Sequence, residues 1–215
     1  MTTVSAWAQT PPGDGLNEER IFGIMPNFAT VNVPTPATAP LTRKQKWNLA
    51  WKESIDPFNL VNAAIGAGFS QAGNQTPSYG GGGAAYAKRY GAALADLTTQ
   101  NVFSAGVFAN LLHQDPRYFR KGPEFSVLHR VGYSLSRIAV ARQDSGKQAF
   151  NASGIFGMML GIGASNLYYP KASVNWEVME GRITTSLTGS LIGNLTSEFW
   201  PDLQRFFHKY HVPLT

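Results

Sequence analysis

Residues 84–113 read AAYAKRYGAALADLTTQNVFSAGVFANLLH. The stretch contains no proline, and its apolar side chains keep to one face over many turns, from Leu94 to Leu112. This pattern predicts one long central helix. Asp115-Pro116 follows directly, and a proline cannot continue the backbone hydrogen bonds of a helix. We therefore expect the central helix to end there.

Helical signals also occur on both sides of the central helix. Thr42 and Gln45 form a capping box, which predicts a helix that stops at Asp56-Pro57 and restarts through residue 69. After the central helix, apolar residues at helical spacing predict further helices at 125–142, 153–168, 175–198 and 201–210. No convincing alternation typical of strands is present. The predicted fold class is all-α, with about six helices in a compact, glycine-rich bundle.

The region before residue 41 has a different character. Residues 9–40 contain six prolines and little helical periodicity, so we expect an extended, proline-rich N-terminal arm. This divides the chain into an arm at 1–40 and a helical domain at 41–215. Residues 20–28 of the arm are too apolar to stay in water, and we expect them to lie as a strap across the chain's own helices or on a neighbouring copy.

The first residues resemble part of a secretion signal. Ala6-Trp7-Ala8 before Gln9 has the small-x-small form of a signal-peptidase site, although the basic and apolar regions of a full signal peptide are missing. We interpret residues 1–8 as a signal-peptide remnant, with a mature protein that begins near Gln9. The alternative is an ordinary disordered start.

The composition limits the classes of function. Charged residues make up only 14% of the chain and hydrophobic residues 43%, so the surface is covered by uncharged polar groups or faces lipid or a partner. The net charge is +5, but the basic residues occur in small, scattered groups, and we predict no nucleic-acid binding. Cysteine is absent, which excludes disulfides and thiolate chemistry.

Uncharged stretches raise the question of a membrane. The longest, residues 148–170, is diluted by polar side chains, so we do not expect it to span a bilayer. Small residues recur four apart, as Gly157 with Gly161 and Gly189 with Gly193, which predicts close helix packing at these positions. Three settings fit such packing: helix dimerisation in a membrane, a tight soluble bundle, or helices that lie in a bilayer interface.

The densest polar segment follows the central helix. We predict that His113 and Asp115 form an acid–base pair and that Arg117, Arg120 and Lys121 hold a phosphate or carboxylate. The alternative is a helix end and an ordinary turn. No metal site and no cofactor are predicted. The candidate ligand-binding residues are His113, Asp115, Arg117, Tyr118, Arg120 and Lys121.

Four segments carry a resemblance to a known family. RIFGIMPNF at 20–28, KRYGAA at 88–93, DPRYFRKG at 115–122 and EFWPD at 198–202 occur in this order. They are similar to segments of an uncharacterised family of predicted exported proteins from acidobacteria. The resemblance spans nearly the whole chain and implies export and an envelope location, in the periplasm or at the outer membrane. It carries over no catalytic residue, and the short N-terminus departs from the exported pattern.

Together these observations predict a non-enzymatic helical protein of the cell envelope, peripheral to a membrane or part of an assembly. The expected partners are a membrane surface, an envelope protein or further copies of this chain. The alternative function is a small-ligand-binding protein or enzyme with its site around residues 113–121.

Overall fold

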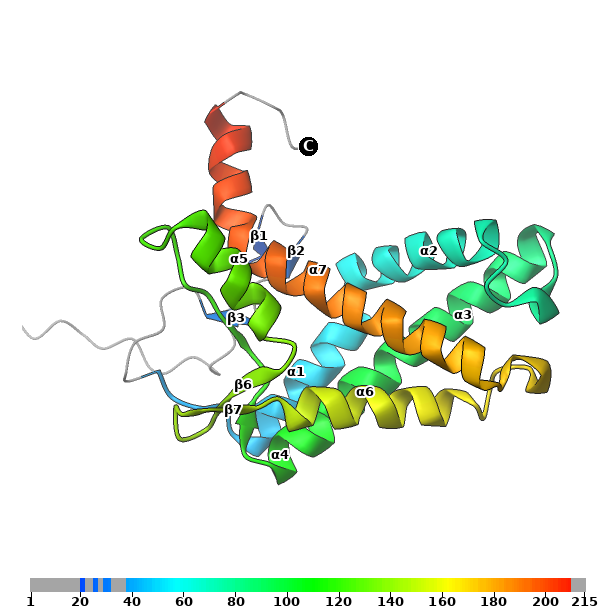
Figure 1. Cartoon of the computed structure of the whole chain (residues 1–215), viewed down its shortest axis with the longest axis horizontal. Coiled ribbons are helices and arrows are strands. Elements are labelled where there is room, and N and C mark those ends of the chain that lie inside the picture. The colour runs from blue at the N-terminus through cyan, green and yellow to red at the C-terminus, as the bar shows by residue number, and fades with distance from the viewer. Residues whose placement is uncertain (1–19, 22–24, 27–28, 32–37, 210–215) are drawn as a thin grey trace, which may run out of the picture.

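The computed structural model describes residues 20–21, 25–26, 29–31 and 38–209, and these residues are mostly helical (Figure 1). Among them the chain forms six helices, of which one is built from three consecutive parts. The helices are α1 (Arg43–Ile55), α2 (Pro57–Ala72), the central helix of α3 (Gly82–Asn101), η2 (Val102–Phe108) and α4 (Ala109–Leu111), then α5 (Val127–Ser136), α6 (Ala152–Ser165) and α7 (Trp176–Lys209). Short 3-10 turns lie at η1 (Pro77–Tyr79) and η3 (Lys171–Ser173).

The starts of α1 and α2 are those that the sequence predicted. The Thr42 hydroxyl accepts from the backbone N–H of Gln45, and the Gln45 side chain accepts from the backbone N–H of Thr42. Asp56 caps α2 by accepting from the backbone N–H of Phe58 at 2.9 Å, with Pro57 at the first helical position. Both caps satisfy backbone donors that have no partner inside their helix.

The predicted central helix is present, but it is not α-helical throughout. Residues 102–108 form the wider π-helix η2, which contains Gly106. A methyl group at Gly106 would lie 2.7 Å from the ring of Trp47, so this glycine lets α1 approach the central helix closely. The π-helical section is therefore where two other helices, α1 and α6, press against the central helix.

Two of the predicted helices differ in the structure. The helix predicted at 125–142 ends at Ser136, and the chain instead forms an antiparallel hairpin of β6 (Val140–Gln143) and β7 (Gln148–Phe150), with Gly146 at a φ of 83° in its turn. β4 (Gln114–Asp115) pairs with the other edge of β6. The helices predicted at 175–198 and 201–210 are one helix, α7, with Pro201 inside it.

One more strand pair joins the predicted arm to the rest of the molecule. β3 (Thr30–Val31) pairs in parallel with β5 (Tyr118–Phe119), and the backbone N–H of Tyr118 donates to the carbonyl of Ala29 at 2.8 Å. β1 (Arg20–Ile21) and β2 (Met25–Pro26) pair with each other in antiparallel register. Residues 38–40, just before α1, are also described. The other residues of the predicted arm, 1–19, 22–24, 27–28 and 32–37, lie outside the described residues, and these include the signal-peptide remnant at 1–8.

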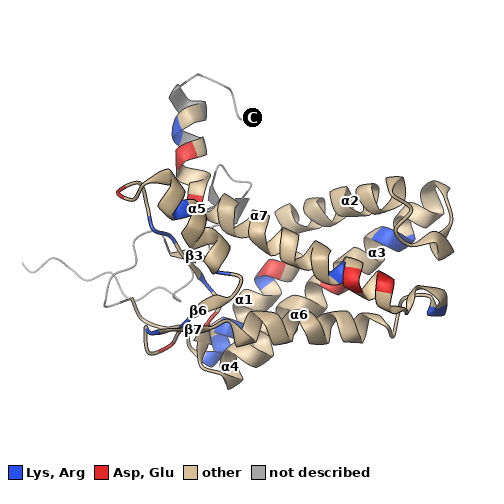
Figure 2. Ribbon diagram, in the orientation of Figure 1, with Lys and Arg blue, Asp and Glu red and all other residues tan. Residues whose placement is uncertain are grey.

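The elements separate into two ends, visible in Figure 1. We call the strands β3–β7, α5 and residues 194–202 of α7 the strand end. We call α2, α3, α6 and the earlier part of α7 the helical end. Figure 2 shows that α2 and α6 contain no charged residue, whereas charged residues gather along the strands and α5.

Few large apolar side chains are buried at either end. Among the described residues, those larger than alanine are Leu41, Leu49, Tyr118, Phe119 and Ile162. The described residues also include several buried charged side chains, and Glu198 is fully inaccessible to solvent. Because a buried charge is stable only when it is paired and hydrogen-bonded, polar contacts define the strand end.

Candidate functional site

The predicted site segment, residues 113–121, runs through β4, a turn and β5. Asp115 is buried, and Arg117 donates to both of its carboxylate oxygens, at 3.0 Å from Nε and 2.7 Å from Nη2. Arg117 Nη2 also donates to the carbonyl of Ala39 at 2.8 Å. The two-pronged contact fixes the turn at Pro116 and holds the chain just before α1 against it.

His113 has a different acidic neighbour from the one that the sequence predicted. Its side chain is 71% exposed, and its Nδ1 lies 3.9 Å from a carboxylate oxygen of Asp144. Asp144 in turn accepts two hydrogen bonds, at 2.8 and 2.7 Å, from the buried ammonium group of Lys46. The acid–base pair predicted for His113 and Asp115 is thus not formed, because each residue contacts a different partner.

Tyr118 and the residues after it converge on Glu198 of α7. One carboxylate oxygen of Glu198 accepts from the Tyr118 hydroxyl and from the backbone N–H of Lys121, both at 3.0 Å. The other accepts from the backbone N–H of Gly122 at 3.2 Å and from Arg130 Nε at 2.9 Å. These four donors compensate the burial of the Glu198 charge.

The same cluster extends along α7. Arg130 donates to the Glu198 carbonyl at 2.9 Å and forms a second ion pair with Asp202 at 2.5 Å. Arg120 is buried, which lowers the pKa of its guanidinium, and its Nε donates to the carbonyl of Ser197 at 2.6 Å. Burial raises the pKa of the Tyr118 hydroxyl, and the nearby Glu198 charge adds to this effect. DPRYFRKG and EFWPD, two segments of the family resemblance, therefore contact each other directly.

Lys121 does not point at an acidic group in this cluster. Its ammonium nitrogen lies 5.0 Å from the ring centre of Phe125 and 5.1 Å from that of Tyr133, within the range of cation–π attraction. Of the six predicted ligand-binding residues, Asp115, Arg117, Tyr118 and Arg120 thus contact other protein groups, and their contacts close a corner between the strands and α7.

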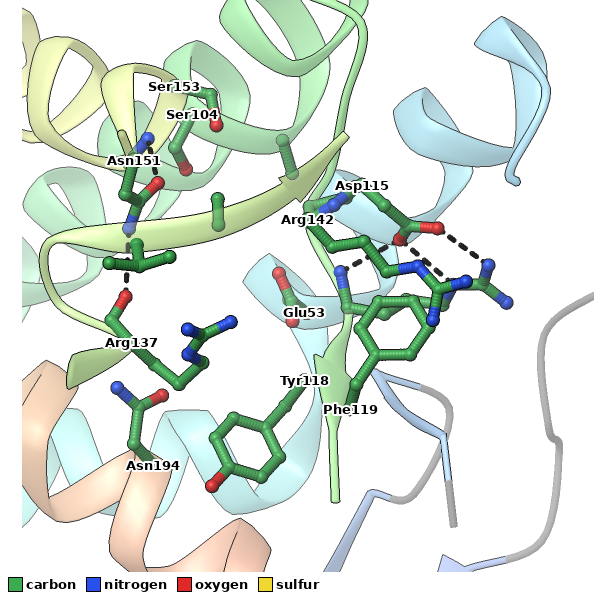
Figure 3. A pocket seen from close by; sticks show the side chains of 16 residues that line it. Glu53, Ser104, Asp115, Tyr118, Phe119, Arg137, Arg142, Asn151, Ser153 and Asn194 are labelled. Carbon is green, nitrogen blue, oxygen red and sulfur yellow. Dashed lines mark hydrogen bonds and ion pairs between the residues drawn. The ribbon is translucent and has the colours of Figure 1, made fainter. Parts of the chain in front are cut away.

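A cavity of about 170 Å³ lies beside this corner. α1, η2, β5, β6, the start of α6 and α7 all contribute to its walls, and Asp115, Arg117 and Tyr118 are among the lining residues. Figure 3 shows the Glu53 carboxyl group between Arg137 on one side and Arg142 with Phe119 on the other. The guanidinium carbon of Arg142 lies 4.5 Å from the Phe119 ring centre.

Glu53 is a carboxyl group in the cavity wall whose pKa is shifted. Burial raises its pKa to about 7, and the neighbouring charge of Asp56 contributes to the same shift. Sequence reasoning missed Glu53, because a glutamate in a helix that carries several charged residues gives no signal of its own. The spacing was informative, since Glu53 follows the buried Lys46 and Leu49 by seven and four residues and so lies on the same helix face.

A smaller polar cluster joins α6, α7 and α3 at the helical end. Asp96 accepts from the hydroxyls of Tyr168 and Tyr169 at 2.5 and 2.7 Å, and burial raises its pKa. The guanidinium carbon of Arg182 lies 3.6 Å from the Tyr169 ring centre. Arg182 also donates to the Ser165 hydroxyl at 2.9 Å. These contacts hold the turn between α6 and α7 against α3.

The four glycines predicted to pack helices fall into two pairs. A methyl group at Gly157 would lie 2.5 Å from Ser104 Cα, and one at Gly161 would lie 2.5 Å from the Gln100 side chain. α6 therefore approaches the central helix closely at both positions. Methyl groups at Gly189 and Gly193 would meet no described atom within 4 Å, so α7 makes no close crossing there within the described part of the chain.

The helical end also exposes large apolar side chains. Val61, Ile65 and Phe69 follow one another at four-residue spacing along α2, with exposed fractions of 57, 53 and 72%. Residues four apart lie on the same side of a helix. They form one stripe, which we call the α2 stripe.

Two further features of the described residues concern metals and membranes. No group of three or more His, Cys, Asp or Glu side chains is arranged to hold a metal ion. None of the described helices is both long enough and apolar enough to cross a bilayer.

No protein-family model, curated protein or solved structure matches the chain.

Proposed function

We propose that this protein is a non-enzymatic helical component of an assembly in the cell envelope, and that copies of the chain associate along α2. The observation that carries the proposal is the α2 stripe, three large apolar side chains exposed on a helix of 16 residues without a charged group.

A surface helix of a lone protein normally directs charged and polar residues to the solvent. In α2 only Ala67 is buried, and the other residues of this charge-free helix are half-buried or exposed in a single chain. Burying a large apolar side chain stabilises by about 1.5 to 3 kcal/mol. Covering Val61, Ile65 and Phe69 with a partner therefore contributes substantial favourable free energy to association.

The chemistry of α2 supports a second copy of the chain as that partner. Helices that bind a membrane surface carry Lys or Arg that face lipid headgroups, and α2 has neither. The net charge of +5 opposes contact between copies in general, but α2 contributes nothing to it. Two copies can therefore meet along α2 without charge repulsion, and a two-fold dimer places the same patch against itself.

The contacts at residues 113–121 support a structural role for that segment. Asp115 and Arg117 bind each other, while Tyr118 and Arg120 bind α7. The hydrogen-bonding groups of these four side chains contact other groups of the chain. This arrangement favours a structural role over catalysis for the segment. The family resemblance supports the envelope location, and fractionation of cells that produce the full-length protein tests it. Recovery in the cytosol alone would contradict the location.

Replacing Ile65 by Lys tests the assembly. A charge in the middle of the α2 stripe would have to be desolvated in the interface, so we expect Ile65→Lys to shift the protein from oligomer to monomer in size-exclusion chromatography with light scattering. The helical circular dichroism should be unchanged, since Ile65 is 53% exposed in the single chain.

Leu128→Lys is the matched control. Leu128 is 82% exposed on α5, at the strand end, and its replacement should leave the oligomer intact. A monomeric wild-type protein at tens of micromolar, or an Ile65→Lys variant with an unchanged mass, would show that copies do not associate along α2.

A further inference from the structure

The cavity beside Glu53 has a buried hydrogen-bond donor without an acceptor in its wall. Arg137 Nε is buried and has no hydrogen-bond partner among the described residues, while its Nη1 donates to Gln148 at 2.6 Å. Ser104 and Ser153 also line the cavity. A buried donor without an acceptor is unfavourable. The cavity is therefore suited to a ligand that supplies acceptor oxygens.

Two of the acceptor side chains at the cavity wall, Asp115 and Asn151, are already in use. Both carboxylate oxygens of Asp115 accept from Arg117. The side-chain oxygen of Asn151 accepts from the backbone N–H of Gly154 at 3.0 Å, at the start of α6. Neither residue offers a free acceptor that would satisfy Arg137.

Glu53 adds a donor when it carries its proton. Because burial raises its pKa to about 7, the carboxyl group is largely protonated at pH 6 and largely ionised at pH 8. A protonated carboxyl has one O–H donor, whereas an ionised one only accepts. The charged and titratable groups beside Glu53 or on the walls that face it are Lys52, Asp56, Tyr118, Arg137, Arg142 and the pair of Asp115 with Arg117.

We propose that the cavity binds a small monocarboxylate, with Arg137 as its cationic partner and the protonated Glu53 side chain as a second donor. The planar guanidinium matches the two oxygens of a carboxylate. At about 170 Å³ the cavity admits a molecule of a few heavy atoms. Arg137 lies over the Tyr133 ring and Arg142 over the Phe119 ring, and each guanidinium carbon is 4.5 Å from the ring centre.

The site makes binding depend on pH. Above pH 7 the ionised Glu53 stops donating and repels an anion, so the affinity for a carboxylate falls as the pH rises from 6 to 8. Glutamine at position 53 keeps an N–H donor and has no charge at any pH. Glu53→Gln should therefore bind the carboxylate equally well at pH 6 and pH 8.

The experiment measures the melting temperature of the purified full chain with acetate as the probe, against sodium chloride of equal ionic strength. Saturating acetate should raise the melting temperature of the wild type by about 3 °C at pH 6 and by much less at pH 8. Glu53→Gln should show the full rise at both pH values. Arg137→Gln should show none, while the control Arg205→Gln, an exposed arginine of α7, should respond as the wild type does.

Several outcomes would overturn the proposal. These are no acetate response in the wild type, a response that persists in Arg137→Gln, or a loss at pH 8 that Glu53→Gln does not restore. Stabilisation by inorganic phosphate but not by acetate would overturn the assignment to a carboxylate. Circular dichroism of each variant at 20 °C confirms that the comparison is made between folded proteins.

Discussion

The strand end and the helical end of the molecule are stabilised by different interactions. At the strand end, Glu198, Arg130 and Asp202 form ion pairs at 2.5 to 2.9 Å, and Glu198 has no solvent exposure. At the helical end, α2 and α6 have no charged residue, and close packing relies on glycines such as Gly157 and Gly161. The α2 stripe remains exposed there.

The difference shows where a single chain satisfies a buried charge and where it leaves an apolar stripe on a charge-free helix exposed. At the strand end each oxygen of the buried Glu198 carboxylate finds its donors within the chain. At the helical end the apolar side chains of α2 find no such cover among the described residues. A buried, fully satisfied cluster specifies its own geometry, whereas an exposed apolar stripe gains most from a partner.

Removing the Glu198 carboxylate should have the largest effect. In Glu198→Ala the buried Arg130 loses one of its two carboxylate partners and the Tyr118 hydroxyl keeps only Ser134 as a side-chain partner, so we expect a loss of about 3 to 5 kcal/mol in the free energy of unfolding. Urea denaturation followed by circular dichroism measures it. Glu180→Ala, an exposed glutamate on the same helix, should change stability by no more than about 0.5 kcal/mol. Equal effects of the two changes would mean that the Glu198 cluster does not stabilise the strand end.

Glu53 on α1, beside the strand end, sharpens the comparison, because its carboxyl group forms no ion pair among the described residues. Its pKa is raised from 4.5 to about 7, so the folded state binds its proton more tightly than the unfolded state does. The free energy of unfolding should therefore fall as the pH rises from about 4.5 to 7, by up to about 1.4 kcal/mol per pH unit.

Glu53→Gln removes this slope. At pH 8 the variant should be more stable than the wild type, by up to about 3 kcal/mol, and at pH 4 the two should agree. Urea denaturation at several pH values, with the exposed Glu177→Gln as control, measures the difference. Parallel curves for the wild type and Glu53→Gln would show that Glu53 titrates alike in the folded and unfolded states.

Two glycines test the packing of the helical end, with a smaller effect. Gly157→Ala places a methyl group 2.5 Å from the Ser104 backbone and should destabilise by about 1 to 3 kcal/mol. Gly189→Ala meets no described atom within 4 Å and should stabilise by up to about 1 kcal/mol, because alanine favours the helix. Thermal unfolding compares them. Shifts in the same direction would mean that the α6 contact with the central helix is not tight.

The elements that the sequence predicted well are those that local signals define. The caps at Thr42 and Asp56 and the long central helix depend on residues within a few positions of one another. The hairpin of β6 and β7 was missed because its strands span only four and three residues, too few for an alternating pattern. Its position depends on pairing with β4, more than twenty residues earlier in the chain.

The candidate site shows the same limit. The sequence singled out Asp115, Tyr118 and Arg120 by their density of polar groups, and all three are buried. The partner of Tyr118 is Glu198, eighty residues later, and nothing in the local sequence indicates that contact. Glu53 joins the cavity for the same reason, since strands and helices from distant segments enclose it.

The Glu198 cluster also constrains the order in which the chain acquires its structure. Arg130 and Tyr118 leave the ribosome long before Glu198, so the strand end lacks its central counter-charge while the intervening residues are synthesised. Until α7 arrives, Arg130 is more stable hydrated than buried. Closure of the strand end therefore waits for α7, and until then the segment with Arg120, Lys121 and Arg130 is a hydrated, positively charged surface.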